Sequence, residues 1–424
     1  MIKYAWIGLF AFVACHSSPS LQKDRALQSL LDRSEYFKLR DSLPLYANEI
    51  SQERRLFFEA CLDNVFNRNG RSNQKIDSIW QDTAKLTDSL KANLLLLKAD
   101  NSFKIYAYAD AARAEDEVIH TYPHAIDSNT LNNIRNESVI NNALKAVPAQ
   151  MTMIQGNTII PWRKDQIGLI EIPVNRKDST YSCIFDTRAN ISTITETYAT
   201  RMGLQRLSGS FNVQSGATGG FVRSTLGVAD SLWIGKILVR HAVFMIMPDP
   251  ALYIAPYKFS LNVILGYPII SQLKEVQINR NGDMYIPQRP AERNLHNLAL
   301  DHLDPVVEAV LDGETLCFGF DTGAATSDLD YNYFLHRRDY ILKNGKSASV
   351  HSGGAGGFIN ENVYKLDSVS LKIGNGAAAL RHVGIASEAM PSLASKFYGN
   401  IGQDFIGQFG KMVLNFQSMY IDFE

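Results

Sequence analysis

Cysteine is scarce in this chain, with four residues in 424, at positions 15, 61, 183 and 317. Cys15 ends an apolar N-terminal run, and the other three have no close spacing, so we expect neither a disulfide framework nor a zinc site. An excess of charge of one sign is also lacking, since 42 Lys and Arg stand against 43 Asp and Glu. Such a chain is not expected to bind nucleic acid by neutralising phosphates. It has no HExxH and no GxSxG motif, and we expect no metal and no cofactor.

Glycine is nearly absent from the first 150 residues, where only Gly8 and Gly70 occur, while the chain holds 28 in all. Glycine is unfavourable inside helices and is favoured in tight turns. The sequence therefore predicts a helical first third and a β-rich remainder with many turns.

Long hydrophobic runs are absent. The N-terminal run at residues 4–14 is shorter than the roughly 20 residues that span a bilayer, and it follows Lys3, as in an export signal. Phe12, Val13, Ala14 and Cys15 resemble a bacterial lipobox. This resemblance implies a signal peptide at residues 1–14 and a lipid on Cys15. It also implies a lipid anchor in the envelope of a Gram-negative-type bacterium, on the periplasmic or outer-membrane side. The alternative is an ordinary secretory signal with an incidental cysteine.

Apolar residues recur every three or four positions between residues 15 and 150, as at Leu86, Leu90, Leu94 and Leu97. This spacing predicts a domain of short amphipathic helices. Stacked helical hairpins of the tetratricopeptide kind are one interpretation, and a plain helical domain is the other. The domain is a candidate surface for a protein partner.

The remaining sequence repeats itself. Strand-like runs end at Asp186 and at Asp321, which are 135 residues apart. Glycine-rich segments follow at residues 215–221 and 352–358, and apolar-Gly elements follow at residues 262–270 and 399–407. The order of landmarks is the same in both copies, so we predict two related β-rich lobes, at residues 151–290 and 291–424.

Each aspartate ends an apolar run and begins a tight turn. A single aspartate there is most simply a turn cap, but two related lobes that face each other would bring two carboxylates together. Such a pair shares one proton and can activate a water molecule against an amide carbonyl. The repeat therefore favours catalysis by Asp186 and Asp321.

The sequence DTGA at residues 321–324, the glycine-rich segments and the two apolar-Gly elements resemble the aspartic protease clan, and most of all its retropepsin-like lobe. The resemblance implies two β-barrel-like lobes about a pseudo-twofold axis and an endopeptidase with Asp186 and Asp321 as catalytic pair. It implies that Thr187 and Thr322 interlock beneath them through hydrogen bonds. It also implies two flaps that close over an extended peptide. Their candidate residues are Gly216, Gly219, Gly220, Gly353, Gly354, Gly356 and Gly357.

One position departs from this pattern. The second copy has Gly323 after its Asp-Thr pair, but the first copy has Arg188. The guanidinium could turn outward and bind substrate carboxylates. It could instead pair with Asp186, lower its pKa and prevent proton sharing, which would leave an inactive peptide-binding scaffold. Ala189 and Ala324 follow the two triplets and carry no hydroxyl, so we expect high pKa values for the pair and a mildly acidic to neutral optimum.

Overall fold

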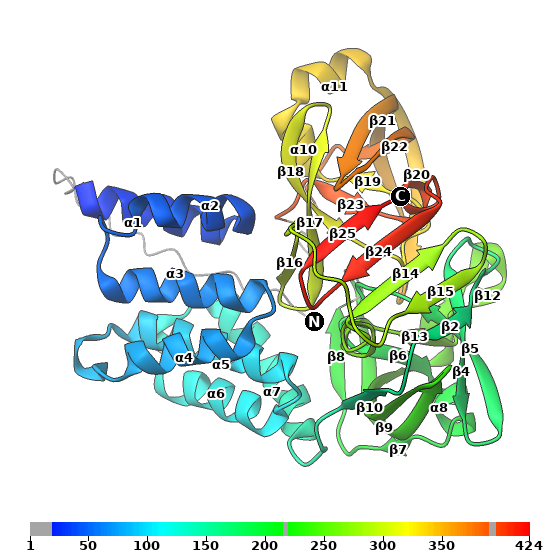
Figure 1. The fold of residues 1–424 in the computed structure, drawn as a ribbon, viewed down its shortest axis with the longest axis horizontal. Helices are drawn as coiled ribbons and strands as arrows, with labels where there is room; N and C mark the ends of the chain where they lie inside the picture. Colours follow the sequence, from blue (N-terminus) through cyan, green and yellow to red (C-terminus); the bar gives the residue numbers. More distant parts are fainter. Residues whose placement is uncertain (1–18, 215–218, 390–395) are drawn as a thin grey trace. The chain divides into compact units, whose positions relative to one another are not determined.

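The computed structural model describes residues 19–214, 219–389 and 396–424. The chain divides into two compact units, a helical unit (Met1–Ala149 with Ala299–His302) and a β unit (Gln150–Leu298 with Leu303–Glu424). The predicted order, a helical region followed by a β-rich region, is confirmed (Figure 1). The predicted export signal and Cys15 lie outside the described residues.

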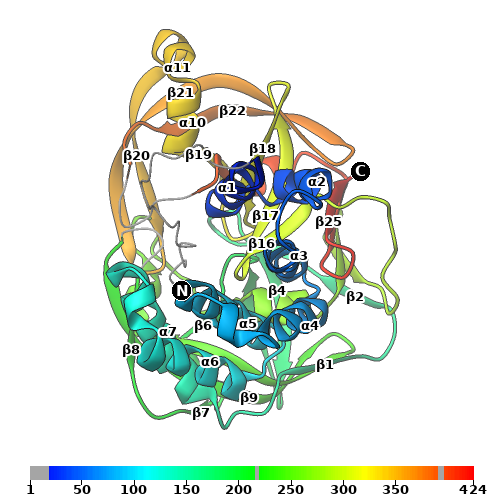
Figure 2. The ribbon, with the colours of Figure 1, turned by 90° about the vertical axis from the view of Figure 1, so that its left-hand side faces the viewer.

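Short helices make up the helical unit, and helices that follow each other in the chain lie side by side (Figure 2). Ser51, Thr87 and Asp127 cap three of them, because each side chain accepts a hydrogen bond from a backbone N–H of the first turn. The tetratricopeptide-like pairing stays a prediction. The helices are α1 (Pro19–Asp32), α2 (Tyr36–Tyr46), α3 (Gln52–Val65), α4 (Asn69–Trp80), α5 (Asp88–Lys104), α6 (Tyr108–Thr121) and α7 (Ser128–Leu144).

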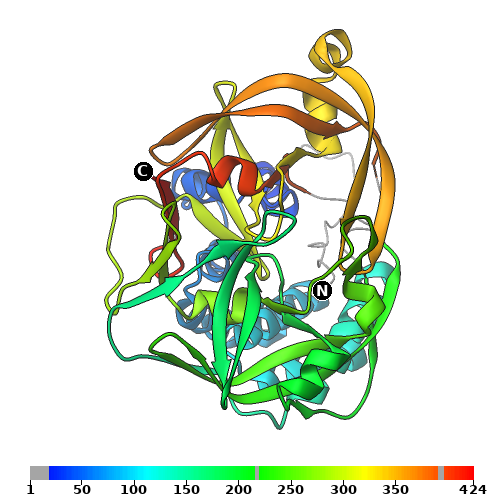
Figure 3. The same cartoon turned by 90° about the vertical axis from the view of Figure 1, so that its right-hand side faces the viewer.

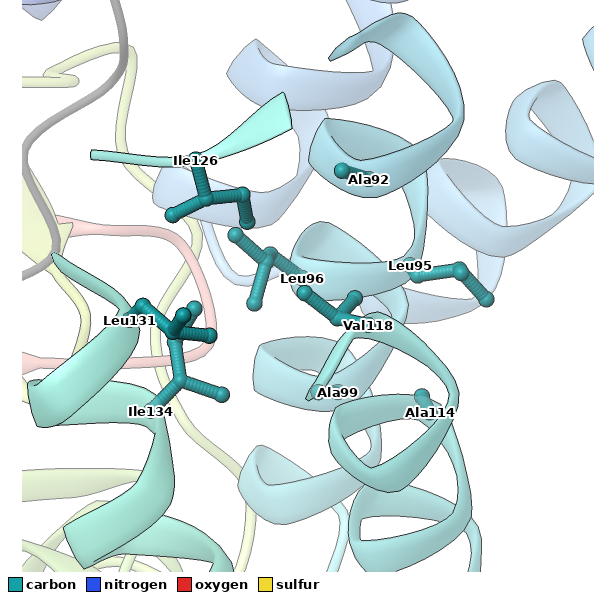
Figure 4. Close-up of a cluster of buried hydrophobic side chains, with 9 residues drawn as sticks. All are labelled: Ala92, Leu95, Leu96, Ala99, Ala114, Val118, Ile126, Leu131 and Ile134. Carbon is teal, nitrogen blue, oxygen red and sulfur yellow. The ribbon is translucent and has the colours of Figure 1, made fainter. Parts of the chain in front are cut away.

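One apolar core joins α5, α6 and α7 (Figure 4). Leu96, Val118 and Ile134 are buried in it, one from each helix, and small residues such as Ala99 and Ala114 let the helix backbones approach closely. These residues fall at the three- and four-residue spacing that marks one helix face. Leu94 and Leu97 of the pattern read from the sequence are also buried, but they lie outside this cluster, to which α5 contributes Ala92, Leu95, Leu96 and Ala99.

A buried ionic cluster lies between α3 and α5. Lys104 Nζ lies 2.7 Å from Asp100 Oδ2 and donates to Asn64 Oδ1 at 3.0 Å, and the Lys104 side chain is 1% exposed. The Asn64 amide donates in turn to Asp100 Oδ2 at 2.6 Å. A buried charge is tolerated when it is paired and hydrogen-bonded in this way.

The β unit is made of strands joined by short turns and short helices. Its first half has β1 (Met151–Ile154), β2 (Thr158–Pro161), β3 (Arg163–Lys164), β4 (Ile170–Arg176), β5 (Ser179–Phe185), β6 (Ser192–Thr195), β7 (Gln205–Arg206), β8 (Phe211–Gln214), β9 (Phe221–Ile234), β10 (Ile237–Met247), β11 (Tyr253–Ile254), β12 (Phe259–Ser260), β13 (Val263–Leu265), β14 (Glu275–Asn279) and β15 (Asp283–Ile286). After β16 (Leu298–Asp301), its second half has β17 (Asp304–Leu311), β18 (Glu314–Phe320), β19 (Asp328–Leu329), β20 (Lys346–Gly354), β21 (Gly357–Ile373), β22 (Gly376–Ala386), β23 (Gly399–Ile401), β24 (Lys411–Asn415) and β25 (Tyr420–Phe423). The helices are α8 (Glu196–Arg201), α9 (Tyr267–Ser271), α10 (Tyr331–His336), α11 (Arg338–Asn344) and α12 (Gln403–Ile406).

The same strand pairings occur in both halves of the β unit. β5 pairs in parallel with β13, and β18 pairs in parallel with β23. β6 pairs in parallel with β10 and antiparallel with β13, and β19 makes the matching pairs with β22 and β23. The register therefore assigns equivalent positions in the two halves, and Ile264 in β13 corresponds to Asn400 in β23.

A further sheet draws on both halves. Its order is β2-β15-β14-β24-β25, with β14 and β24 antiparallel at its centre (Figure 1). The boundary expected at residue 290 therefore separates two sequence repeats that share one sheet.

The hairpin of β20 and β21 reaches from the second half to the first (Figure 3). Gly356 and Gly357 at its tip have φ of 94° and 121°, which glycine adopts without strain. The Gly356 N–H donates to the carbonyl of Ala251 at 2.7 Å, and Ala355 and Phe358 pack against an apolar cluster of the first half.

Among the described residues, no helix has both the length and the apolar character that a bilayer span requires.

Candidate active site

Asp186 and Asp321 occupy matching places at the ends of β5 and β18. The backbone N–H of Asp186 donates to the carbonyl of Leu265 at 3.0 Å, and that of Asp321 donates to the carbonyl of Ile401 at 2.9 Å. In each half the parallel neighbour strand therefore continues its hydrogen bonding up to the aspartate. Each carboxyl group is held at a strand end, where the chain turns away.

Backbone N–H groups of the following turn bind the two carboxyls. Asp186 Oδ1 accepts from the N–H of Arg188 at 2.8 Å and from that of Ala189 at 3.0 Å. Asp321 Oδ1 accepts from the N–H of Gly323 at 2.7 Å. These bonds orient the carboxyls, and each bond favours the ionised form.

Two buried threonines join the turns of the two halves. The N–H of Thr187 donates to Thr322 Oγ1 at 3.1 Å, and the N–H of Thr322 donates to Thr187 Oγ1 at 3.1 Å. Each hydroxyl then donates across to the other half, Thr187 to the carbonyl of Phe320 at 2.9 Å and Thr322 to that of Phe185 at 2.7 Å. The structure thus brings the two predicted threonines together and, with them, the two aspartates that precede them.

The two carboxyl groups influence each other directly. Burial raises the pKa of Asp186, and the negative charge of Asp321 raises it further. Burial also raises the pKa of Asp321, although the charge of Arg188 opposes this. Neither aspartate is fully covered, since both keep part of their surface exposed. The arrangement can hold one proton in contact with solvent.

Gly323 lies against the carboxyl group of Asp186. A Cβ at this position would lie 2.3 Å from the Asp186 Cγ and 2.4 Å from its Oδ2. The absence of a side chain is therefore a requirement of the close approach between the two turns. The sequence resemblance singled out this glycine, and the geometry gives the physical reason for it.

Arg188 takes neither of the two expected positions. Its Nη1 donates to Asn400 Oδ1 at 3.0 Å and its Nη2 lies 3.7 Å from Asp304 Oδ2, so the side chain extends into the second half of the β unit. The interpretation in which Arg188 pairs with Asp186 and lowers its pKa is wrong, because that pKa is raised and the guanidinium has other partners. Its contact with the Asp186 carboxyl is made by its backbone N–H.

Serines and glycines behind the turns repeat the same geometry. Gly266 N–H donates to Ser192 Oγ at 3.0 Å, and Gly402 N–H donates to Ser327 Oγ at 2.9 Å. A Cβ at Gly266 would lie 2.1 Å from a backbone carbonyl oxygen, and one at Gly402 would lie 2.7 Å from the equivalent oxygen. The apolar-Gly elements identified in the sequence therefore support the aspartate turns from behind.

The predicted flap glycines fall in two hairpins. Gly353 and Gly354 end β20, and Gly356 and Gly357 form the tip that contacts the first half. Gly219 and Gly220 lie between β8 and β9, and Gly216 lies outside the described residues.

Four residues at the site were missed by reasoning from the sequence: Ser192, Ser327, Asp304 and Asn400. The two serines follow the aspartates at the same distance of six residues, which is a signal that the repeat contained. Asp304 and Asn400 replace apolar residues of the first copy, and only the fold shows what these replacements contact. No group of three or more His, Cys, Asp and Glu side chains in the described ranges is arranged to hold a metal ion.

A family model described as aspartyl protease matches residues 172–269. The match runs from β4 to α9 and contains Asp186, while Asp321 lies beyond it. No curated protein matches the chain. The first half of the β unit thus has an aspartyl protease-like sequence, and this likeness supports a hydrolase of the peptidase type.

Proposed function

We propose that the chain is an aspartic endopeptidase whose catalytic pair is Asp186 and Asp321, carried on two lobes related by a pseudo-twofold axis. The observation that carries the proposal is the close approach of the two aspartate turns, in which a Cβ at Gly323 would lie 2.3 Å from the Asp186 Cγ. The raised pKa values of the two carboxyls agree with it. Two carboxyls in contact share one proton, so a general base and a general acid are present together. The reciprocal bonds of Thr187 and Thr322 support the same proposal, since they hold the two turns in one geometry.

The reaction needs only these two side chains and water. The ionised carboxylate takes a proton from water while the water oxygen bonds to the amide carbon, and the protonated carboxyl gives its proton to the carbonyl oxygen. The C–N bond of the resulting gem-diol then breaks. The nitrogen takes the proton held by the first carboxyl, and a gem-diol hydroxyl returns a proton to the second. The pair ends in its starting state.

The substrate in this proposal is a peptide held as an extended strand. The hairpin of β20 and β21 is the candidate flap, because its tip already contacts Ala251 of the first half through the Gly356 N–H. A backbone group that bonds to the other half in the free protein can bond to a peptide backbone instead. Recognition by strand pairing uses main-chain hydrogen bonds of this kind.

The test is cleavage of a complex peptide mixture, read by mass spectrometry, because no sequence specificity has to be assumed. The wild-type protein is expected to cleave, and Asp186→Asn and Asp321→Asn are expected to lose at least about 10³-fold in rate. The matched control is Asp178→Asn, which changes an exposed aspartate in the turn after β4 and is expected to leave the rate unchanged. Equal cleavage by wild type and Asp321→Asn would refute the proposal.

A different result would favour the scaffold alternative. If the wild-type protein cleaves nothing but binds peptides of the same mixture, the β unit serves as a peptide-binding module. The orientation of Arg188 speaks for the enzyme, since the side chain that could have neutralised Asp186 bonds to Asn400 and Asp304 instead.

We further propose that the protein is anchored in the cell envelope by a lipid on Cys15. The support is the lipobox-like sequence at residues 12–15, preceded by Lys3 and a short apolar run. Metabolic labelling with a radioactive fatty acid is expected to label the wild-type protein and not Cys15→Ser. Labelling of neither protein, with release of both in soluble form, would favour the ordinary secretory signal. A protein partner for the helical unit stays a prediction.

A further inference from the structure

Equivalent positions of the two halves have opposite chemistry beside the aspartates. In the first half, the side chains of Leu169, Ile184 and Ile264 are buried in one apolar cluster. The strand registers place Asp304, Gly319 and Asn400 at the matching positions of the second half. An apolar cluster in one half is therefore replaced by two polar side chains and a glycine in the other.

The Arg188 side chain occupies the space that this replacement creates. Its Nη1 donates to Asn400 Oδ1 at 3.0 Å and its Nη2 lies 3.7 Å from Asp304 Oδ2. A Cβ at Gly319 would lie 2.9 Å from Nη1 and 3.2 Å from Cζ of the guanidinium, so a larger residue would displace it. Asp304, Gly319 and Asn400 in the second half therefore all accommodate the arginine that replaces glycine at position 188 in the first half. Arg188 lies in a polar site formed by these residues.

The orientation of the Asn400 amide follows from this contact. Its oxygen accepts from Arg188, because a guanidinium can only donate. Its Nδ2 then faces the other way and lies 3.5 Å from Asp321 Oδ2, as a donor. Arg188, Asn400 and Asp321 thus form a polar chain that ends on one of the two carboxyls.

We propose that Arg188 is a positioning residue that acts through Asn400 to keep Asp321, rather than Asp186, the ionised member of the pair. This inference rests on the proposed endopeptidase function and deepens it. Asp321 is then the general base that takes the proton of water, and Asp186 is the general acid that protonates the carbonyl oxygen.

The surrounding charges fit this assignment. Burial raises the pKa of Asp321, and the positive charge of Arg188 is the largest influence that lowers it. Three further acidic residues face Arg188, and their charges raise its pKa. They are Asp304 of β17, Asp328 of β19 and Asp330, which follows β19. Burial, and then the charge of Asp330, raise the pKa of Asp328 itself. If the guanidinium were absent, the negative charges of Asp304 and Asp330 would disfavour ionisation of Asp321.

The experiment compares the pH dependence of kcat/KM for wild type and Arg188→Met. The acidic limb of the profile reports the ionisation of the pair in the free enzyme. Loss of the cation raises the pKa of this ionisation, so the limb is expected to move to higher pH by about one unit. Arg188→Lys keeps a cation at the position and is expected to move it by less. The control Arg206→Met removes an exposed arginine of β7 and is expected to leave the limb in place.

A second variant keeps the test decisive if Arg188→Met does not fold. Asn400→Ala retains the pair of Arg188 and Asp304 but removes the donor to Asp321, and it is expected to move the same limb in the same direction by a smaller amount. If either folded variant loses activity equally at every pH, with the limb unmoved, Arg188 is only structural and the inference is overturned. This outcome is separate from a failure of the endopeptidase proposal, in which Asp321→Asn cleaves as well as wild type.

Discussion

Thr187 and Thr322 each accept a hydrogen bond from the backbone N–H of the other, both at 3.1 Å, and both side chains are fully buried. Their hydroxyls donate to carbonyls of the opposite half at 2.9 and 2.7 Å. The backbone N–H and the hydroxyl of each threonine are thus all hydrogen-bonded. The two turns that carry the aspartates are therefore held in one relative position.

Replacement of Thr187 by valine is expected to lower both stability and activity. Valine keeps the shape but removes the hydroxyl, which leaves the buried N–H of Thr322 and the carbonyl of Phe320 without this partner. The cost is about 2 to 4 kcal/mol in the free energy of unfolding. Urea denaturation measures it, and Thr187→Ser, which keeps the hydroxyl, should lose much less. Equal losses in both variants would show that methyl packing matters more than the hydrogen bonds.

A methyl group at position 323 is expected to abolish catalysis while it leaves the fold largely intact. In Gly323→Ala the new Cβ would have to share space with the Asp186 carboxyl, which lies 2.3 Å away at Cγ. The carboxyl must then move away from Asp321, and the shared proton is lost. Gly156→Ala is the matched control, since nothing lies within 4 Å of a Cβ at that position. Peptide cleavage and circular dichroism of both variants provide the comparison.

The stability of the β unit is expected to depend on pH through the paired carboxyls. Burial, and then the charge of Asp321, raise the pKa of Asp186, so the folded state holds a proton that the unfolded chain releases above about pH 4. The stability that this carboxyl contributes is therefore present in acid and is lost as pH rises through the raised pKa. Asp186→Asn removes this dependence.

Denaturation at several pH values measures the effect. Between about pH 4 and 7, Asp186→Asn should gain at least about 1 kcal/mol relative to wild type. Asp178→Asn should follow the wild-type curve throughout. A constant difference between Asp186→Asn and wild type would contradict the expected pKa shift.

In the helical unit, the buried ion pair should matter far more than an exposed one. Asp100→Ala leaves the Lys104 ammonium buried without its carboxylate and is expected to cost about 3 to 5 kcal/mol. Asp77→Ala is the control, because its pair with Lys98 is exposed, with side-chain exposures of 64% and 43%, and is worth at most about 1 kcal/mol.

The same pair has a predictable pH dependence. Burial works against the ionised Asp100, but Lys104 and His302, which both bond to its carboxylate, together outweigh it and hold the pKa well below its usual range. Its contribution to stability is present at neutral pH and is lost in acid as pH falls through the lowered pKa. Thermal unfolding should therefore show the difference between Asp100→Ala and wild type shrinking in strong acid.

Much of the architecture follows from local patterns. The helical first third was predictable because its apolar residues repeat at helical spacing and glycine is rare there. Asp186 and Asp321 could be singled out because two copies of one pattern place each of them at the end of an apolar strand. Gly266 and Gly402 could be found in the same way, since a close backbone approach leaves a glycine in the sequence.

Only the tertiary structure decided the direction of the Arg188 side chain and the residues that it contacts. The sequence by itself determined that a charged residue stands where the other copy has glycine, and it left open whether the guanidinium turns outward to bind substrate carboxylates or pairs with Asp186. The answer depends on Gly319 and Asn400, which are more than 130 residues away in the chain. No sequence pattern links either of them to Arg188. Side-chain direction is set by the free space and the hydrogen-bond partners that the folded chain supplies, and a linear pattern contains neither.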